Sequence, residues 1–129
     1  MRARMKVVAL VGASGSGKTT LLCQLIAQYV AEGKRVAAIK HTHHALNFDE
    51  RGDTARFRAA GAETVILAGE REAIVQQELV NYGDPRELLA HVRGADVVLI
   101  EGFKQYGGWP RVEVTGETSP GEVRRMIDP

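Results

Sequence analysis

The chain has 129 residues and a net charge of +1, and 44% of its residues are hydrophobic. This length predicts a single domain over residues 1–129. The balanced charge excludes a general attraction to nucleic acid or membranes. A single cysteine, Cys23, cannot form a disulfide framework, and no apolar run is long enough for a signal peptide or a membrane span. We therefore expect a soluble, cytoplasmic protein.

Short apolar runs alternate with helical patterns along the chain. We expect buried strands at 7–11 and 96–101 and further strands at 36–39, 64–68 and 111–114, the last at an edge. A weaker strand is expected at 73–77, antiparallel at an edge. We expect helices at 18–32, 53–60, 84–94 and from 119 onward. Gly33 is in place to end the first helix, and Ser119 to cap the last. This alternation predicts an α/β fold with a mainly parallel sheet flanked by helices, with an edge strand or hairpin.

Residues 12–22 read GASGSGKTTLL and match the G-x-x-x-x-G-K-[ST] pattern between a strand and a helix. Glycines let backbone N–H groups converge on an anion, and the helix that follows presents its positive end there. Lys18 is expected to reach the β- and γ-phosphates, and Thr19 to give its hydroxyl to Mg²⁺. The serines either add hydrogen bonds or are simply small residues that fit. The pattern predicts a P-loop NTPase fold whose phosphate site comprises Gly12, Ser14, Gly15, Ser16, Gly17, Lys18, Thr19 and Thr20.

Glu101 follows the four apolar residues 97–100. Groups that face a ligand gather at the carboxyl ends of parallel strands. A nucleotide triphosphate site also needs a carboxylate that orients Mg²⁺. We therefore predict that Glu101 joins Thr19 as the metal-binding pair. The alternative is an ordinary acid at a strand end that faces solvent.

Three histidines follow the second strand in the stretch KHTHH, at residues 40–44. They are expected at the same sheet edge as the glycine loop. One hypothesis is metal capture by the imidazoles, which the lack of a partner cysteine or a second His/Cys cluster weakens. The other is contact with an anionic ligand. Further along, Asp53 starts a predicted helix and could either cap it or approach the magnesium.

The blocks GASGSGKTTLL, AAIKHTHH, DERGDTARFRAAGAE, VVLIEGFK and WPRVEV occur in this order. With them the chain resembles, over residues 6–114, the MobB family of molybdopterin-guanine dinucleotide biosynthesis adaptors. The resemblance implies a homodimer that binds GTP and Mg²⁺, with at most slow GTP hydrolysis. It implies partnership with the guanylyltransferase that joins GMP to molybdopterin, and it allows contact with molybdopterin itself. The KHTHH and EGFK blocks would face ligand or partner, which adds His41, His43, Gly102 and Lys104 to the site.

Guanine specificity rests on this resemblance, because the sequence contains no N/T-K-x-D stretch, the usual guanine reader of GTPases. Two alternative functions stay open. The first is a P-loop metallochaperone GTPase in which His41, His43 and His44 handle a metal such as nickel. The second is a small-molecule kinase, because GASGSGKTT is similar to the loop of uridine-type kinases. A kinase needs a lid with arginines and a catalytic aspartate, and this chain has little spare length for a lid.

Overall fold

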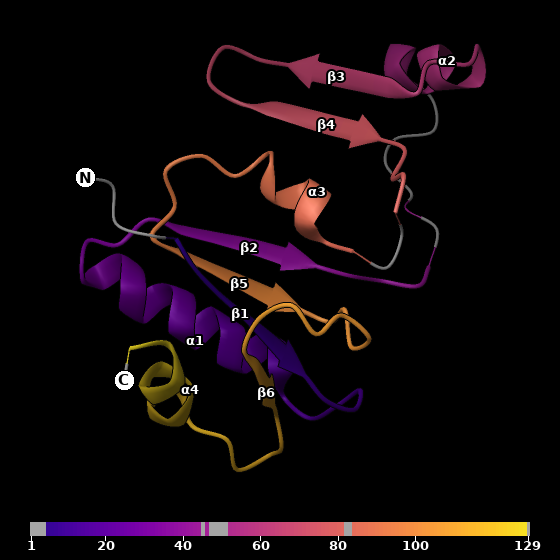
Figure 1. Cartoon of the computed structure of the whole chain (residues 1–129). Helices are drawn as coiled ribbons and strands as arrows, with labels where there is room; N and C mark the ends of the chain where they lie inside the picture. Colours follow the sequence, from indigo (N-terminus) through magenta and orange to yellow (C-terminus); the bar gives the residue numbers. More distant parts are fainter. Residues whose placement is uncertain (1–4, 45, 47–51, 82–83, 129) are drawn as a thin grey trace. The chain divides into compact units, whose positions relative to one another are not determined.

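The computed structural model describes residues 5–44, 46, 52–81 and 84–128. The chain divides into two compact units (Figure 1). The first, here called the sheet unit, comprises Met1–Thr42 and Gly83–Pro129. The second, the hairpin unit, comprises His43–Tyr82. None of the helices in the described part of the chain is long and apolar enough to cross a membrane.

A four-stranded parallel sheet forms the centre of the sheet unit, with strand order β2-β5-β1-β6. Its strands are β1 (Lys6–Val11), β2 (Val36–Lys40), β5 (Val97–Glu101) and β6 (Arg111–Glu113). In β5, the residues Val97, Val98, Leu99 and Ile100 are each at most 3% exposed. β5 is thus buried on both faces, which explains why it reads as a continuous apolar run.

Helices cover both faces of this sheet. On one face α1 (Lys18–Ala31) and α4 (Pro120–Ile127) enclose the larger core, which includes Leu25, Tyr29 and Val123. Figure 1 shows these two helices on the same side of the sheet. On the other face the short α3 (Arg86–Leu89) and aromatic side chains of the 103–109 segment cover a smaller cluster around Ala9, Val98 and Ile100.

The ends of α1 and α4 follow their local sequence. At the end of α1, Gly33 has φ 82°, and the N–H groups of Gly33 and Lys34 donate to the carbonyl oxygens of Val30 and Tyr29. This hydrogen-bond pair is a Schellman motif, for which glycine is the favoured residue. At the start of α4, the Ser119 hydroxyl accepts the Glu122 N–H at 3.2 Å. Both expected helix boundaries are confirmed.

The hairpin unit contains α2 (Asp53–Ala59) and two antiparallel strands, β3 (Thr64–Ala68) and β4 (Ala73–Gln77). The register places Ile66 opposite Val75 and Leu67 opposite Ile74. The Gly69 N–H donates to the Glu72 carbonyl at 2.8 Å and closes the turn. Of the residues in these two strands, Val65 alone is buried.

The structure confirms the expected α/β fold, with its parallel sheet, flanking helices and antiparallel hairpin. The strand at 64–68 belongs to the hairpin and not to the parallel sheet. The expected helix over 84–94 is wrong in length, because α3 ends at Leu89. Pro85 is the N-cap residue of α3, and before it the Asp84 carboxylate accepts the Arg86 N–H at 2.9 Å and pairs with the Arg86 guanidinium.

Candidate functional site

The glycine loop between β1 and α1 has a backbone that most residues adopt only with strain. Gly12, Gly15 and Gly17 have φ angles of 155°, 81° and 90°. At Gly12 space is also limiting, because a Cβ there would lie 2.7 Å from the carbonyl oxygen of Val114. Gly17 is the N-cap of α1, and no side chain caps this helix. The first N–H groups of α1 therefore remain available for an anion.

Lys18 folds back over this loop. Its Nζ donates to the carbonyl oxygens of Gly12, at 2.7 Å, and of Ala13, at 2.9 Å. The ammonium group thus lies beside the loop, where it can exchange carbonyl contacts for phosphate oxygens. The Ser16 hydroxyl oxygen is buried and has no hydrogen-bond partner in the described part of the chain. Since buried polar atoms are normally satisfied, this oxygen indicates a place for a ligand.

The clearest contact at the site joins Thr19 and Glu101, which are 82 positions apart in the sequence. The Thr19 hydroxyl donates to the Glu101 carboxylate, with Oγ1 at 3.2 Å from Oε1 and 3.4 Å from Oε2. The pair forms because β1 and β5 are neighbours, with Leu10 opposite Glu101. A hydroxyl and a carboxylate side by side are the hard oxygen ligands that Mg²⁺ prefers. The residues present therefore fit a nucleotide phosphate chain with its magnesium ion.

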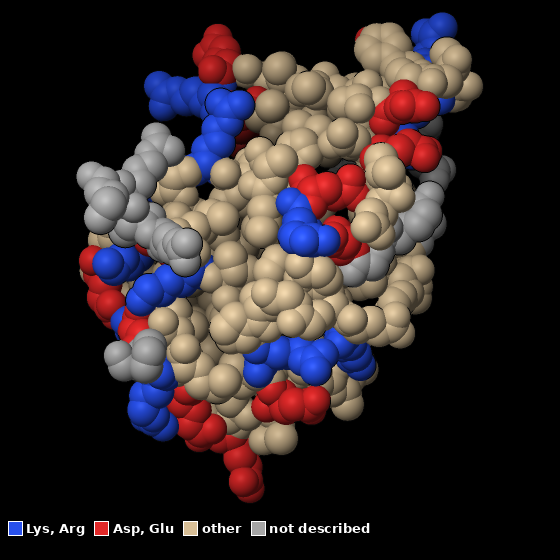
Figure 2. All heavy atoms as spheres, viewed as in Figure 1, with Lys and Arg blue, Asp and Glu red and all other residues tan. Residues whose placement is uncertain are grey.

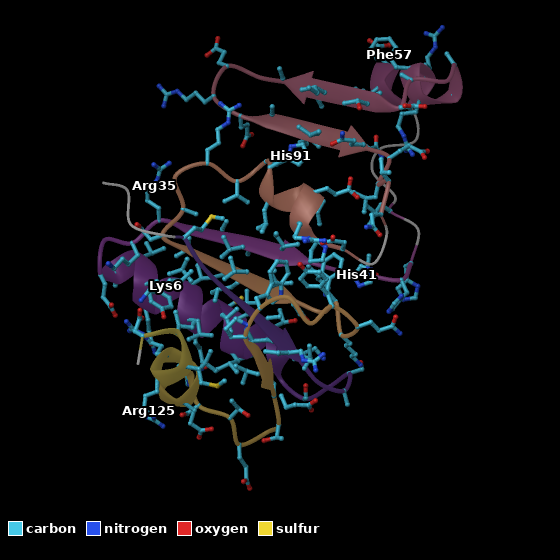
Figure 3. The ribbon with its side chains drawn as sticks, in the orientation of Figure 1. Lys6, Arg35, His41, Phe57, His91 and Arg125 are labelled. Atoms are coloured by element: carbon cyan, nitrogen blue, oxygen red, sulfur yellow. The ribbon has the colours of Figure 1, made fainter. Side chains whose placement is uncertain are left out.

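His41 and Gly102 directly follow Lys40 and Glu101, which are paired at the ends of β2 and β5. Figure 3 labels His41 at the end of β2. The His41 N–H donates to the Glu101 carbonyl at 2.9 Å, and the His41 ring stacks on Phe103 with the ring centroids 4.2 Å apart. Phe103 is 5% exposed and has a left-handed φ of 54°. A Cβ on Gly102 would lie 3.1 Å from the His41 Cβ. This packing holds the backbone that follows Glu101 on β5 against the backbone that follows β2.

Sequence reasoning did not select Phe103. Nothing in the local sequence indicates the left-handed backbone of Phe103. Lys104 lies in the turn that follows, and its carbonyl accepts a hydrogen bond from the Arg111 guanidinium. Ser14 and Thr20 are exposed, the first in the loop and the second in the first turn of α1.

Two predicted site residues fall in the hairpin unit. His43 is at the start of this unit, and Asp53 is the first residue of α2. The expectation that Asp53 caps the helix is wrong, because the N-cap is Gly52. The approach of Asp53 to the magnesium stays a prediction. Within the described residues, no three His, Cys, Asp or Glu side chains are grouped as a metal site would require.

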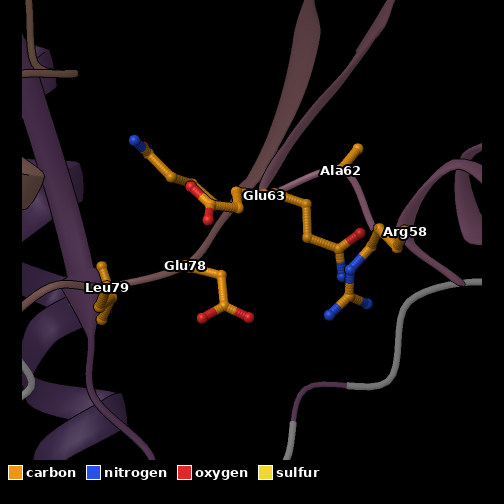
Figure 4. A pocket seen from close by; sticks show the side chains of 7 residues that line it. Arg58, Ala62, Glu63, Glu78 and Leu79 are labelled. Carbon is orange, nitrogen blue, oxygen red and sulfur yellow. The ribbon is translucent and has the colours of Figure 1, made fainter. Parts of the chain in front are cut away.

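The hairpin unit has a cavity of its own, with a volume of about 320 Å³ (Figure 4). It is bounded by the end of α2 and the ends of both strands, where the Glu78 N–H donates to the Glu63 carbonyl at 3.1 Å. None of the nucleotide-site or metal-site residues predicted from the sequence lines this cavity. Its lining is mostly polar and consists of Arg58, Ala62, Glu63, Gln76, Gln77, Glu78 and Leu79.

Charged side chains are mixed on the face shown in Figure 2, where basic and acidic groups stand next to one another. This agrees with the net charge of +1. Positive charge at the glycine loop is therefore confined to a few groups near it. They come from Lys18 and the start of α1.

A parallel sheet flanked by helices, with a glycine-rich loop after its first strand and a carboxylate at the end of the neighbouring strand, defines a small α/β protein. The family model of molybdopterin guanine dinucleotide synthesis protein B, MobB, matches residues 7–126. The chain belongs to the MobB family, and the resemblance seen in the sequence is confirmed.

Two curated relatives are identical to this chain at more than a third of the aligned residues. The molybdopterin-guanine dinucleotide biosynthesis adapter protein of Haemophilus influenzae is 38% identical over 108 residues, which are 81% of this chain and 61% of the relative. The adapter protein of Escherichia coli is 37% identical, over 76% of this chain and 59% of the relative. The chain thus spans about three fifths of the length of these two proteins.

Solved MobB structures have the same fold. The MobB homolog from Bacillus stearothermophilus is 31% identical, with a TM-score of 0.59 over 84% of this chain and 62% of that one. Bacillus subtilis MobB is 25% identical, with a TM-score of 0.65 over 95% of this chain and 71% of that one.

Proposed function

We propose that this chain binds GTP with Mg²⁺ at the glycine loop and acts as an adapter in molybdopterin-guanine dinucleotide synthesis. The observation that carries the proposal is the Thr19–Glu101 contact at 3.2 Å, directly beside the loop that holds Lys18. A phosphate-binding loop without a magnesium ligand would only hold an anion. The hydroxyl and carboxylate together suit a nucleotide that carries its metal ion.

Each part of the site has a separate task in this proposal. The N–H groups of the loop and of the first turn of α1 hold the phosphate chain. Lys18 leaves the carbonyls of Gly12 and Ala13 for the β- and γ-phosphates, which are stronger acceptors because they are charged. Thr19 and Glu101 hold Mg²⁺, which neutralises phosphate charge when it is bound. The His41–Phe103 stack keeps Glu101 in position.

The adapter role rests on the family and on the surface of the hairpin unit. The curated relatives are named as adapter proteins of this biosynthesis. The guanylyltransferase that joins GMP to molybdopterin is the partner we propose, and molybdopterin is a further candidate ligand. We also propose a homodimer, because four large apolar side chains of β3 and β4 are at least 42% exposed: Ile66, Leu67, Ile74 and Val75. A second copy would cover such side chains.

The test is guanylyl transfer to molybdopterin by the guanylyltransferase, with and without this protein. We expect the wild-type protein to increase product formation, and Lys18→Ala to give no increase at the same concentration. Lys34→Ala is the matched control, since Lys34 is exposed beyond the end of α1. Equal product with and without the wild-type protein would refute the adapter role.

A further inference from the structure

The cavity of the hairpin unit lies at the open end of the two strands. Thr64, the first residue of β3, is paired with Gln77, the last residue of β4. One position further, the Glu78 N–H donates to the Glu63 carbonyl at 3.1 Å, so these two glutamates stand opposite each other. Both line the cavity, as does Arg58 of α2. The cavity therefore brings two acidic side chains and one basic side chain together.

Strand geometry places both glutamates and an amide on one face of the hairpin. Side chains alternate between the two faces of a strand, and residues that are directly opposite across two strands share a face. Gln76 is opposite Val65, and the opposed Glu78 and Glu63 are each two positions away from them, on the same face. Gln76 also lines the cavity. Two carboxylates and one amide thus border the cavity from the hairpin, and Arg58 borders it from α2.

The hairpin does not use these polar groups for its own contacts. Within the described residues, the side chains of Arg58, Glu63, Gln76 and Glu78 form no hydrogen bond or ion pair. In Figure 4 the Glu78 carboxylate and the Arg58 guanidinium point into the same open space. Like charges directly opposite each other destabilise a pair of strands, and hydrogen-bond donors placed between two carboxylates remove this cost. The arrangement therefore favours a ligand with donors for the glutamates and an acceptor for Arg58.

An aminopyrimidinone ring, the ring that pterins and guanine share, has this pattern of donors and acceptors. It carries an amino group beside a ring N–H, and a carbonyl oxygen on the other side of that N–H. One carboxylate can accept the two adjacent donors in parallel. The second hydrogen of the amino group is then left for the other carboxylate, and the carbonyl oxygen for the guanidinium. The cavity volume of about 320 Å³ is at the lower end for ligand pockets, which suits one or two fused rings.

We propose that the cavity of the hairpin unit binds an aminopyrimidinone ring, with Glu63 and Glu78 on its donor edge and Arg58 on its carbonyl oxygen. The choice of this ligand class rests on the proposed function, in which molybdopterin, a pterin, is a candidate ligand. The binding itself does not depend on the glycine loop, because Lys18 and Glu101 belong to the sheet unit. The hairpin unit thus has a ligand site of its own.

The test is the binding of pterin and of guanosine to the whole chain by isothermal titration calorimetry. Neither compound carries a phosphate, so the glycine loop does not contribute. Lumazine, in which an oxygen replaces the amino group of pterin, and inosine, which is guanosine without its amino group, are the matched controls. We expect pterin, guanosine or both to bind at least about tenfold more tightly than the matched control, because the amino group donates to carboxylates. The preferred compound tells whether the ring of molybdopterin or that of a guanine nucleotide is the ligand.

Variants of the lining glutamates test the site itself. Glu63→Gln and Glu78→Gln should both weaken binding of the preferred compound, the larger loss being about ten- to hundredfold, as for a charged hydrogen-bond pair. Glu72→Gln is the matched control, because Glu72 is an exposed glutamate at the turn of the same hairpin and does not line the cavity. Lys18→Ala should also leave this binding unchanged. Circular dichroism of each variant checks that the fold is kept.

The outcomes separate this inference from the proposed nucleotide site. Wild-type protein that binds neither pterin nor guanosine would overturn the inference, and so would equal affinity for lumazine and inosine. Binding that Glu63→Gln and Glu78→Gln both leave unchanged would overturn it as well, because the ligand would then be held elsewhere. A titration with GTP and Mg²⁺ decides the glycine loop separately. Protein that binds pterin through the two glutamates but does not bind GTP would support the cavity and refute the nucleotide site.

Discussion

The sheet unit and the hairpin unit differ most in how they bury apolar side chains. In the sheet unit, Leu10, Leu99 and Ile100 are 0% exposed between layers of helices. In the hairpin unit, Ile66 is 59% exposed and Ile74 is 50% exposed, although both are in strands. A two-stranded sheet with one short helix has too few layers to enclose its side chains.

This difference indicates a division of tasks. The contacts that suit a nucleotide, among them Lys18 on the loop carbonyls and the Thr19–Glu101 pair, belong to the sheet unit. Precise positioning of ligand groups needs side chains held by close packing, which the sheet unit supplies. The hairpin unit instead has exposed apolar side chains, which a partner would cover under the proposed function. Five predictions test this division, from the largest expected effect to the smallest.

Removal of Lys18 should affect ligand binding alone. Lys18→Ala should weaken GTP binding by at least about a hundredfold, because the ammonium group makes charged hydrogen bonds to phosphate and has no part in the core. Isothermal titration calorimetry measures the loss, and the thermal unfolding of the variant should match that of wild type. Unchanged affinity would contradict the assignment of the glycine loop.

Truncation of leucines should have very different costs in the two units. Leu99→Ala should lower the free energy of unfolding by about 2–5 kcal/mol, because Leu99 is fully buried and a cavity remains. Leu67→Ala should cost less than about 1 kcal/mol, because Leu67 is 54% exposed. Urea unfolding at several protein concentrations measures both. A concentration-dependent cost for Leu67→Ala would indicate that a dimer buries this residue.

A charge on the hairpin should break the proposed dimer. Neighbouring residues of a strand point to opposite faces. Ile66→Asp therefore places a carboxylate on one face of the hairpin, and Leu67→Asp places one on the other face. We expect at least one of them to give a monomer of 14.1 kDa in light scattering at micromolar concentration. Thr64→Asp, at an exposed position of the same strand, is the control. Wild-type protein that is itself a monomer would refute the dimer.

Neutralisation of Glu101 should reduce only the magnesium-dependent part of binding. Glu101→Gln should lower GTP affinity about tenfold with Mg²⁺, because an amide is a weaker ligand for a hard cation than a carboxylate. With EDTA present, the variant and wild type should bind GTP equally. The same loss under both conditions would show that Glu101 acts through the structure around it.

The smallest effect concerns pH and the packing of α4. A hydrogen bond from the Lys6 ammonium holds the pKa of Asp128 below its usual value near 3.8, and a second bond comes from the Tyr29 hydroxyl at 3.0 Å. A lowered carboxyl pKa means stability that is present above this usual value and is lost as pH falls through the lower folded value. The partly exposed pair should contribute less than about 1 kcal/mol.

Asp128→Asn tests this contribution by urea unfolding at two pH values. The free energy of unfolding should be lower than in wild type at pH 7, and the difference should shrink at pH 3. A difference of the same size at both pH values would contradict an ionic origin.

Several features of the protein were determined by local sequence. The loop of residues 12–19, the end of α1 at Gly33 and the start of α4 at Ser119 all depend on residues within a few positions of one another. The strands β1 and β5 were predicted from their apolar runs, because burial on both faces leaves a continuous pattern. Most of the glycine loop, and Glu101 as the acid beside it, could therefore be selected before the fold was seen.

Other features were decided only by the tertiary structure. The Thr19–Glu101 contact and the position of Val114 against Gly12 depend on which strands are neighbours. The left-handed backbone of Phe103 and its stack on His41 depend on the same neighbours. Strand order is set by contacts between residues far apart in the chain, and the periodicity of apolar residues indicates whether a strand is buried but not beside which strand it lies.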